Sequence, residues 1–370
     1  MFDLAVREDD WARADTLIRR KFPKGLPFDV RVVFAAMRRD TATLRQLRAE
    51  GQTTAGEKGR KRDRALEAGS LLATYGSLMG TYLEDPGMAE EFTRLSTQPS
   101  LPIRIRAPAH LSLAGLSISG GRWSTAKQEL AMAARLGQED SALVGRALAA
   151  SLPFLGVPRE DIRRIRHEVE RWSPGRDASK PLRESIRPLA PHLRLYLLGL
   201  LSTRLGNLVE AIRLASELET LPASPQSRAV VRSLARTIRA DVATESGRTN
   251  EGLTLLEEVR GNIPFELLTL PYFSEEHARY LRSRLLFQAG RDEEALRLVE
   301  NGFAGTPGEL YYLAPAHLLQ AEIQQRLGNK EAATEQYSRF IALWRSCDAP
   351  LRPVVEGART QLARLVGEPR

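Results

Sequence analysis

The residues of this sequence that could do chemistry are few, and their spacing does not bring them together. Five histidines are spread along the chain: His110, His167, His192, His277 and His317. None stands three or four positions from another, and the single cysteine is Cys347. A zinc site needs three or four converging ligands. The sequence therefore predicts no metal site and no cofactor.

Acidic pairs and loop motifs that resemble catalytic signatures fail on spacing. Adjacent carboxylates such as Glu293 and Glu294 point about 100° apart on a helix, so they cannot form a facing acid/base pair. The stretch 51–58 resembles a phosphate-binding loop but has an extra residue before Lys58 and lacks a following Ser or Thr. The stretch 115–120 misses the spacing of a nucleophile elbow by one residue. We expect no catalytic residue and a protein that is not an enzyme.

Composition indicates a soluble globular protein. The chain has 370 residues, of which 42% are apolar and 27% charged, enough to bury a large core. Its longest uncharged runs are shorter than the roughly 20 apolar residues of a membrane span. The start, MFDLAVREDDW, lacks the basic and apolar segments of a signal peptide. With one cysteine, we expect a cytoplasmic protein without membrane association.

One short phrase recurs along the chain, and each copy is marked by a glycine. The five anchors are Gly121, Gly206, Gly247, Gly290 and Gly328. A glycine after an apolar-periodic stretch is typical of a helix end, because it adopts the left-handed conformation without a Cβ penalty. Each anchor therefore predicts the end of one helix and the start of another.

Small residues stand at fixed distances from these anchors. Five positions later come Ala126, Ala211, Gly252, Ala295 and Ala333, and seven positions earlier come Ala114, Gly199, Ala240, Ser283 and Ala321. Small residues at these places allow two helices to cross closely. Pro264 and Pro307 stand 17 residues after two of the anchors, Gly247 and Gly290, and are typical helix stops. The anchor spacing doubles between Gly121 and Gly206, which predicts a degenerate unit whose second helix covers 159–172.

These registered positions resemble the tetratricopeptide repeat over roughly residues 101–350. The units are longer than the consensus of about 34 residues, as in the divergent repeats of bacterial transcriptional activator domains. The last sixty or so residues are similar to the closing segment of repeat regions in bacterial signalling regulators. The resemblance implies an all-α fold, a right-handed α-α superhelix of antiparallel helical hairpins.

The sequence also suggests how the chain is divided. We expect degenerate N-terminal hairpins over 1–50, a basic linker over 51–64 and divergent helical repeats over 65–172. A loop follows over 173–181, and tetratricopeptide-like repeats with a C-terminal capping helix cover 182–370.

The resemblance also implies where a partner would bind. In tetratricopeptide arrays the first helices line the concave face, with contacts ten, six and two residues before each anchor. The Lys and Asn of carboxylate-clamp adaptors are missing there, so chaperone C-termini are not expected partners. We predict a concave face that contacts a partner through Tyr196, Arg204, Tyr280, Arg284, Glu322 and Arg326. The alternative for both tyrosines is packing between neighbouring hairpins.

Two functional hypotheses follow. The first is a non-enzymatic scaffold that binds a protein or peptide partner, in bacterial signalling or transcriptional regulation. The alternative is a nucleic-acid-associated regulator that uses the basic run 58–64 and the Arg-rich stretch 159–171. The net charge of +8 is spread along the whole chain, and the Arg-rich stretch also carries four acidic residues, which favours the first hypothesis.

Overall fold

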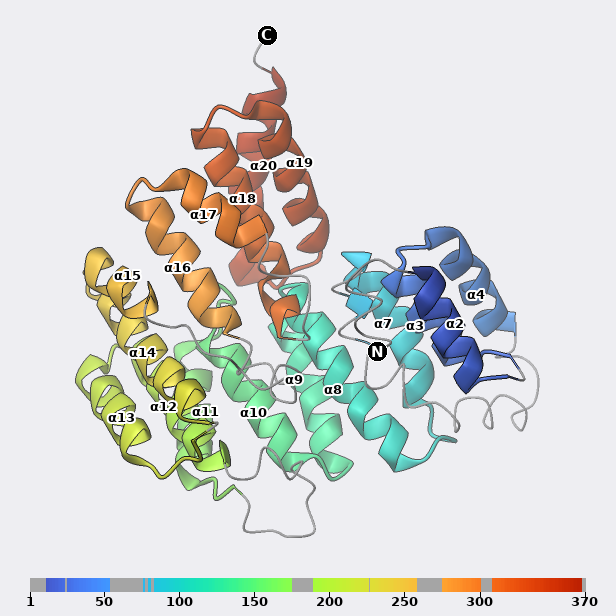
Figure 1. Ribbon diagram of the computed structural model, residues 1–370, viewed down its shortest axis with the longest axis horizontal. Helices are drawn as coiled ribbons and strands as arrows, with labels where there is room; N and C mark the ends of the chain where they lie inside the picture. The colour runs from blue at the N-terminus through green and yellow to red at the C-terminus, as the bar shows by residue number, and fades with distance from the viewer. Residues whose placement is uncertain are drawn as a thin grey trace.

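All regular structure in the described part of the chain is helical. The computed structural model describes residues 11–23, 25–53, 76, 79–80, 83–174, 189–225, 227–257, 275–300 and 308–367. From α7 (Pro86–Arg94) onward, each described α-helix packs against the next along the chain. Figure 1 shows the resulting curved array of antiparallel hairpins. The prediction of an all-α helical-repeat solenoid is confirmed.

Six hairpins and a final helix form the array within the described residues. The hairpins are α8 (Ile103–Ser119) with α9 (Trp123–Arg135), α10 (Glu139–Ser151) with α11 (Arg159–Arg171), α12 (Ala190–Arg204) with α13 (Leu208–Thr220), α14 (Arg228–Glu245) with α15 (Thr249–Glu257), α16 (Glu276–Gln288) with α17 (Asp292–Glu300), and α18 (Leu313–Arg326) with α19 (Lys330–Leu343). The final helix is α20 (Arg352–Gly367). The pair α10–α11 is the degenerate unit predicted between Gly121 and Gly206.

Shorter elements precede and join these hairpins. They are α2 (Trp11–Lys21), α3 (Phe28–Met37), α4 (Thr41–Thr53), α7 (Pro86–Arg94) and the short 3-10 helices η1 (Leu95–Thr97), η4 (Glu309–Tyr312) and η5 (Ala349–Leu351). Helix α4 occupies the first three residues of the predicted linker. The rest of that linker, most of the predicted loop 173–181, Pro264 and Pro307 lie outside the described residues.

The anchor glycines end the first helices as predicted. All five have a φ between +68° and +81°, in the left-handed region that favours glycine. The residue after each anchor donates its backbone N–H to the carbonyl of the residue five positions before it, as from Asn207 to Ser202 at 2.9 Å. This bond closes the last turn of the helix and fixes the direction of the chain into the second helix.

The small residues lie where the helices cross. Ala126, Ala211, Ala295 and Ala333 are fully buried between the two helices of their hairpins. At Gly199 of α12, a Cβ would stand 2.5 Å from Cδ1 of Ile238 on α14. A larger residue at this position would therefore require the side chain of Ile238 to shift.

First helices lie on the inner side of the curve. Successive first helices, from α8 to α18, contact one another, whereas successive second helices make few contacts or none within the described residues. In α12, 12 of 15 residues are buried, but only 4 of 13 in α13. The inner helices are thus covered on most sides, and the outer helices carry the exposed face.

The N-terminal helices add a second core at one end of the array. Val32 and Ala36 of α3 and Leu44 and Leu47 of α4 belong to the same buried cluster as Leu310 of η4. Residues from the start and the end of the chain therefore share one core.

The array closes on itself through the turn after α19. The indole Nε1 of Trp344 donates to the carbonyl of Ser119 at 2.9 Å. Asp348 accepts from the backbone N–H and the hydroxyl of Ser124, in the first turn of α9. The end of the last hairpin is thereby fixed to the α8–α9 turn, so the solenoid forms a closed ring rather than an open arc.

Candidate partner-binding surface

The six predicted contact residues all lie on inner helices. Tyr196 and Arg204 belong to α12, Tyr280 and Arg284 to α16, and Glu322 and Arg326 to α18. The register taken from the anchors therefore places them on first helices, as expected. Their environments divide them into three pairs.

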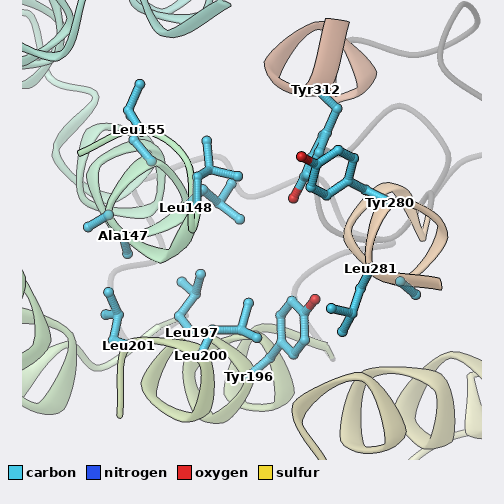
Figure 2. Packing of buried hydrophobic residues seen from close by; sticks show 14 of the residues in the cluster. Ala147, Leu148, Leu155, Tyr196, Leu197, Leu200, Leu201, Tyr280, Leu281 and Tyr312 are labelled. Carbon is cyan, nitrogen blue, oxygen red and sulfur yellow. The ribbon is translucent and has the colours of Figure 1, made fainter. Parts of the chain in front are cut away.

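The two tyrosines are buried, which fits the alternative that they pack between neighbouring hairpins. Tyr196 is 3% exposed and Tyr280 is 7% exposed. The ring centroid of Tyr280 lies 5.4 Å from that of Phe154 and 5.3 Å from that of Tyr312. Burial raises the pKa of Tyr280 to about 12. Closure of the ring brings η4 and the α10–α11 loop over this face, so both tyrosines pack inside the chain (Figure 2).

Two of the arginines hold neighbouring repeats together. Arg326 forms a hydrogen-bonded ion pair with Asp292 in the first turn of α17, and its guanidinium lies 3.6 Å from the ring centroid of Phe287. Arg204 donates to the carbonyl of Pro153 at 3.4 Å and lies 3.7 Å from a carboxylate oxygen of Glu245. Both side chains therefore make contacts within the chain.

Arg284 and Glu322 remain available for a partner. Glu322 is exposed, and Arg284 is partly exposed on the neighbouring inner helix. Within the described residues, neither makes a hydrogen bond or an ion pair. They still act on each other, since desolvation raises the pKa of Glu322 while the charge of Arg284 lowers it. Together they form an accessible pair of opposite charges on the inner side of the ring.

Sequence reasoning missed a buried polar cluster beside these residues. The Nδ1 of His277 lies 3.0 Å from the hydroxyl of Tyr312, and its Nε2 lies 3.7 Å from a carboxylate oxygen of Asp241. These three side chains are all buried. The sequence did point to Asp241, because it lies six residues before the anchor Gly247, at one of the expected contact positions.

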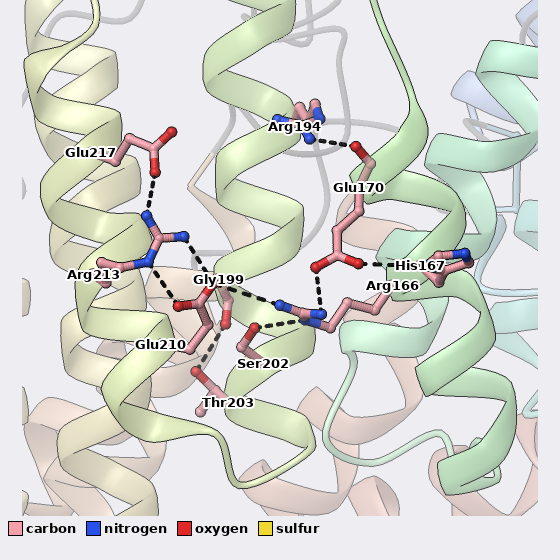
Figure 3. A network of polar contacts seen from close by, with 10 residues as sticks. All are labelled: Arg166, His167, Glu170, Arg194, Gly199, Ser202, Thr203, Glu210, Arg213 and Glu217. Carbon is pink, nitrogen blue, oxygen red and sulfur yellow. Dashed lines mark hydrogen bonds and ion pairs between the residues drawn. The ribbon is translucent and has the colours of Figure 1, made fainter.

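The Arg-rich helix α11 uses much of its charge within the chain. Arg166 bonds Glu170 at 2.7 Å and Ser202 at 3.0 Å, and lies 3.6 Å from Glu210 (Figure 3). Arg164 pairs with Asp161. Arg163 and Arg171 stay exposed. The basic run 58–64, the other element of the nucleic-acid hypothesis, lies outside the described residues.

The described residues contain no group of three or more His, Cys, Asp or Glu side chains that could hold a metal ion. Cys347 is buried, and burial raises the pKa of its thiol. None of the described helices combines the length and the apolar character that crossing a bilayer requires.

The sequence matches no family model and no curated protein sequence. Among solved structures, it is similar to a tetratricopeptide repeat protein from Parabacteroides merdae ATCC 43184, with 16% identity and a TM-score of 0.38 over 81% of this chain and 99% of that chain. It is also similar to the apo form of the quorum sensor NprR from B. thuringiensis, with 11% identity and a TM-score of 0.35 over 94% and 99%. The assignment to a tetratricopeptide-like fold rests on the hairpins themselves.

Proposed function

We propose that this chain is a non-enzymatic scaffold that binds a protein or peptide partner through the inner side of the ring, in bacterial signalling or transcriptional regulation. The observation that carries the proposal is the Arg284–Glu322 pair. Both charges stand on inner helices, both are accessible, and neither has a hydrogen-bonding partner within the described residues. Two such charges of opposite sign on the inner side of the ring suit a partner segment that carries complementary charges.

The architecture supports the same conclusion. Helical-repeat arrays present extended surfaces whose side chains come from fixed positions in each unit. Four of the six predicted residues already make contacts within the chain. Tyr196 and Tyr280 are buried, Arg326 forms an ion pair with the neighbouring repeat, and Arg204 contacts a backbone carbonyl and a carboxylate. The contact surface is therefore narrower than the predicted groove and centres on α16 and α18.

A charge-swap experiment tests the proposal. The tagged chain is used to recover partners from native lysate with and without nuclease, beside the double variant Arg284→Glu/Glu322→Arg. A charge-matched control swaps the exposed pair Arg248 and Glu251 at the start of α15. We expect a discrete protein that survives nuclease and is lost with the first variant but kept with the second.

Two results would contradict the proposal. Recovery of nuclease-sensitive material alone would favour the nucleic-acid hypothesis, whose binding falls steeply with salt. Equal recovery by both variants would show that Arg284 and Glu322 do not contact the partner.

A further inference from the structure

A cleft of about 570 Å³ lies between the start of α7 and the α18–α19 hairpin. This volume is within the range of small-molecule sites in proteins. One wall consists of residues 84–94, and the opposite wall contains His317 and residues 339–346. Neither Arg284 nor Glu322 lines this cleft, so it is distinct from the pair described above.

Charged side chains of both signs line the cleft. The first wall supplies four carboxylates, and the lining from the other elements supplies Arg122, Arg339 and Arg345. Arg339 bonds Glu84 at 2.9 Å, and Arg122 bonds Glu90 at 2.6 Å. The first pair joins the two walls, and the second joins the first wall to the α8–α9 turn.

His317 provides a buried acceptor at this site. Its side chain is 7% exposed, and its Nδ1 lies 2.7 Å from Oε1 of Gln336. When Nδ1–H donates to that oxygen, Nε2 carries a lone pair, and Nε2 has no hydrogen-bond partner. Burial lowers the pKa of His317, which favours this neutral form.

The distance between two hydrogen-bond acceptors indicates which chemical group the cleft would bind. Nε2 of His317 lies 3.9 Å from Oε2 of Glu84. A hydrogen bond does not span that distance directly, but one nitrogen with two N–H donors can reach both atoms through bonds of roughly 2.9 Å. A primary ammonium has the donors and the charge for this place, since it has three N–H groups and faces a carboxylate.

Arg345 provides the complementary group. It lines the same cleft, its side chain is exposed, and within the described residues it makes no hydrogen bond or ion pair. A free guanidinium binds a carboxylate through two parallel hydrogen bonds. The other arginines on this side already hold carboxylates of the opposite wall.

We propose that this cleft binds a small zwitterion, with its primary ammonium between His317 and Glu84 and its carboxylate on Arg345. The ligand would join the α7 segment to the last hairpin of the ring, in addition to the ion pairs already there. The proposal does not depend on the scaffold function, since a partner on α16 and α18 uses other side chains.

Calorimetric titration of the full chain tests the proposal with ω-amino acids of increasing length: glycine, β-alanine, 4-aminobutyrate and 6-aminohexanoate. Butylamine and butyrate supply the two charged groups separately. We expect saturable binding with one preferred length, and binding at least about tenfold weaker for either half, as the loss of a charged hydrogen bond predicts.

Variants locate the binding. Arg345→Ala should weaken the preferred zwitterion about tenfold. Arg359→Ala on α20, whose guanidinium pairs with Glu356, is the matched control and should bind as the parent does. His317→Phe, with folding checked by circular dichroism, should lose the ammonium contact. The proposal is overturned if no member of the series binds at millimolar concentration, if the halves bind as well, or if Arg345→Ala binds unchanged.

Discussion

The carboxylate of Asp348 accepts hydrogen bonds from the backbone nitrogen and the hydroxyl of Ser124, at 2.8 and 2.7 Å, across 224 residues of sequence. Helix α9 has no side-chain cap of its own, since Arg122 at its N-cap makes none. Asp348 therefore supplies the cap of α9 from the opposite end of the array, and its negative charge also suits the helix dipole.

Removing this cap should loosen the ring. We expect Asp348→Ala to lower the free energy of unfolding by about 1 kcal/mol, the usual cost of a lost N-cap. Hydrogen exchange should speed up both in the first turn of α9 and in residues 344–351. Urea unfolding and exchange measured by mass spectrometry check this. Glu356→Ala, which removes an exposed pair on α20, is the control and should change neither.

The crossing of α12 and α14 should be sensitive to a single methyl group. A Cβ at Gly199 would stand 2.5 Å from Ile238, so we expect Gly199→Ala to cost about 1–3 kcal/mol through overpacking. Gly357 on α20 has open space around it, and Gly357→Ala should instead gain up to about 1 kcal/mol from helix propensity. Thermal and urea unfolding of the two variants measure the difference. Partial rescue of Gly199→Ala by Ile238→Ala would identify the clash, whereas equal effects of the two alanines would refute it.

Substitutions of Tyr280 and Arg284 should have very different effects on stability, although the two residues lie one turn apart on α16. Tyr280→Ala removes a buried ring from the cluster with Phe154 and should cost about 3–5 kcal/mol. Arg284→Ala should change the free energy of unfolding by no more than about 0.5 kcal/mol. Chemical denaturation tests both. A strongly destabilised Arg284→Ala would show that this arginine is part of the core.

Glu90 should contribute to stability at neutral pH and lose that contribution in acid. Burial alone raises the pKa of this carboxyl, but hydrogen bonds from Arg122 and Arg94 outweigh it and hold the pKa below the ordinary value of 4.5. The unfolded chain then binds the proton first, so stability is complete above the ordinary value and falls as the pH drops through the folded-state pKa. Glu90→Gln should flatten this acid-side loss. Unfolding curves at a series of pH values test it, with Glu356→Gln as an exposed control that should keep the slope of the parent.

The repeat pattern could be predicted from sequence because it rests on local constraints. A left-handed turn selects glycine at Gly206, and a close crossing selects a small residue at Ala211, whatever the rest of the chain does. The degenerate unit was predicted in the same way, since α11 begins at Arg159 as expected. These signals lie within about forty residues of each other.

The closure of the ring could not be predicted in this way. The contact of Trp344 with Ser119 depends on the summed curvature of all the hairpins between them, and no single spacing encodes that sum. For the same reason the register placed Tyr196 and Tyr280 on inner helices, but it could not show that Phe154 and Tyr312 cover that side. Arg284 and Glu322, which make no hydrogen bond or ion pair within the described residues, were among the predicted contacts.

The order of synthesis determines when α9 can receive its cap. Ser124 leaves the ribosome 224 residues before Asp348, and domains generally fold from the N-terminus as the chain grows. The first repeats can pack on their neighbours during this time, because each needs only the adjacent unit. Until η4 and the last hairpin are made, the rings of Phe154 and Tyr280 lack the cover that Tyr312 provides. During that interval, a chaperone or an early partner can reach apolar surface that the finished protein no longer exposes.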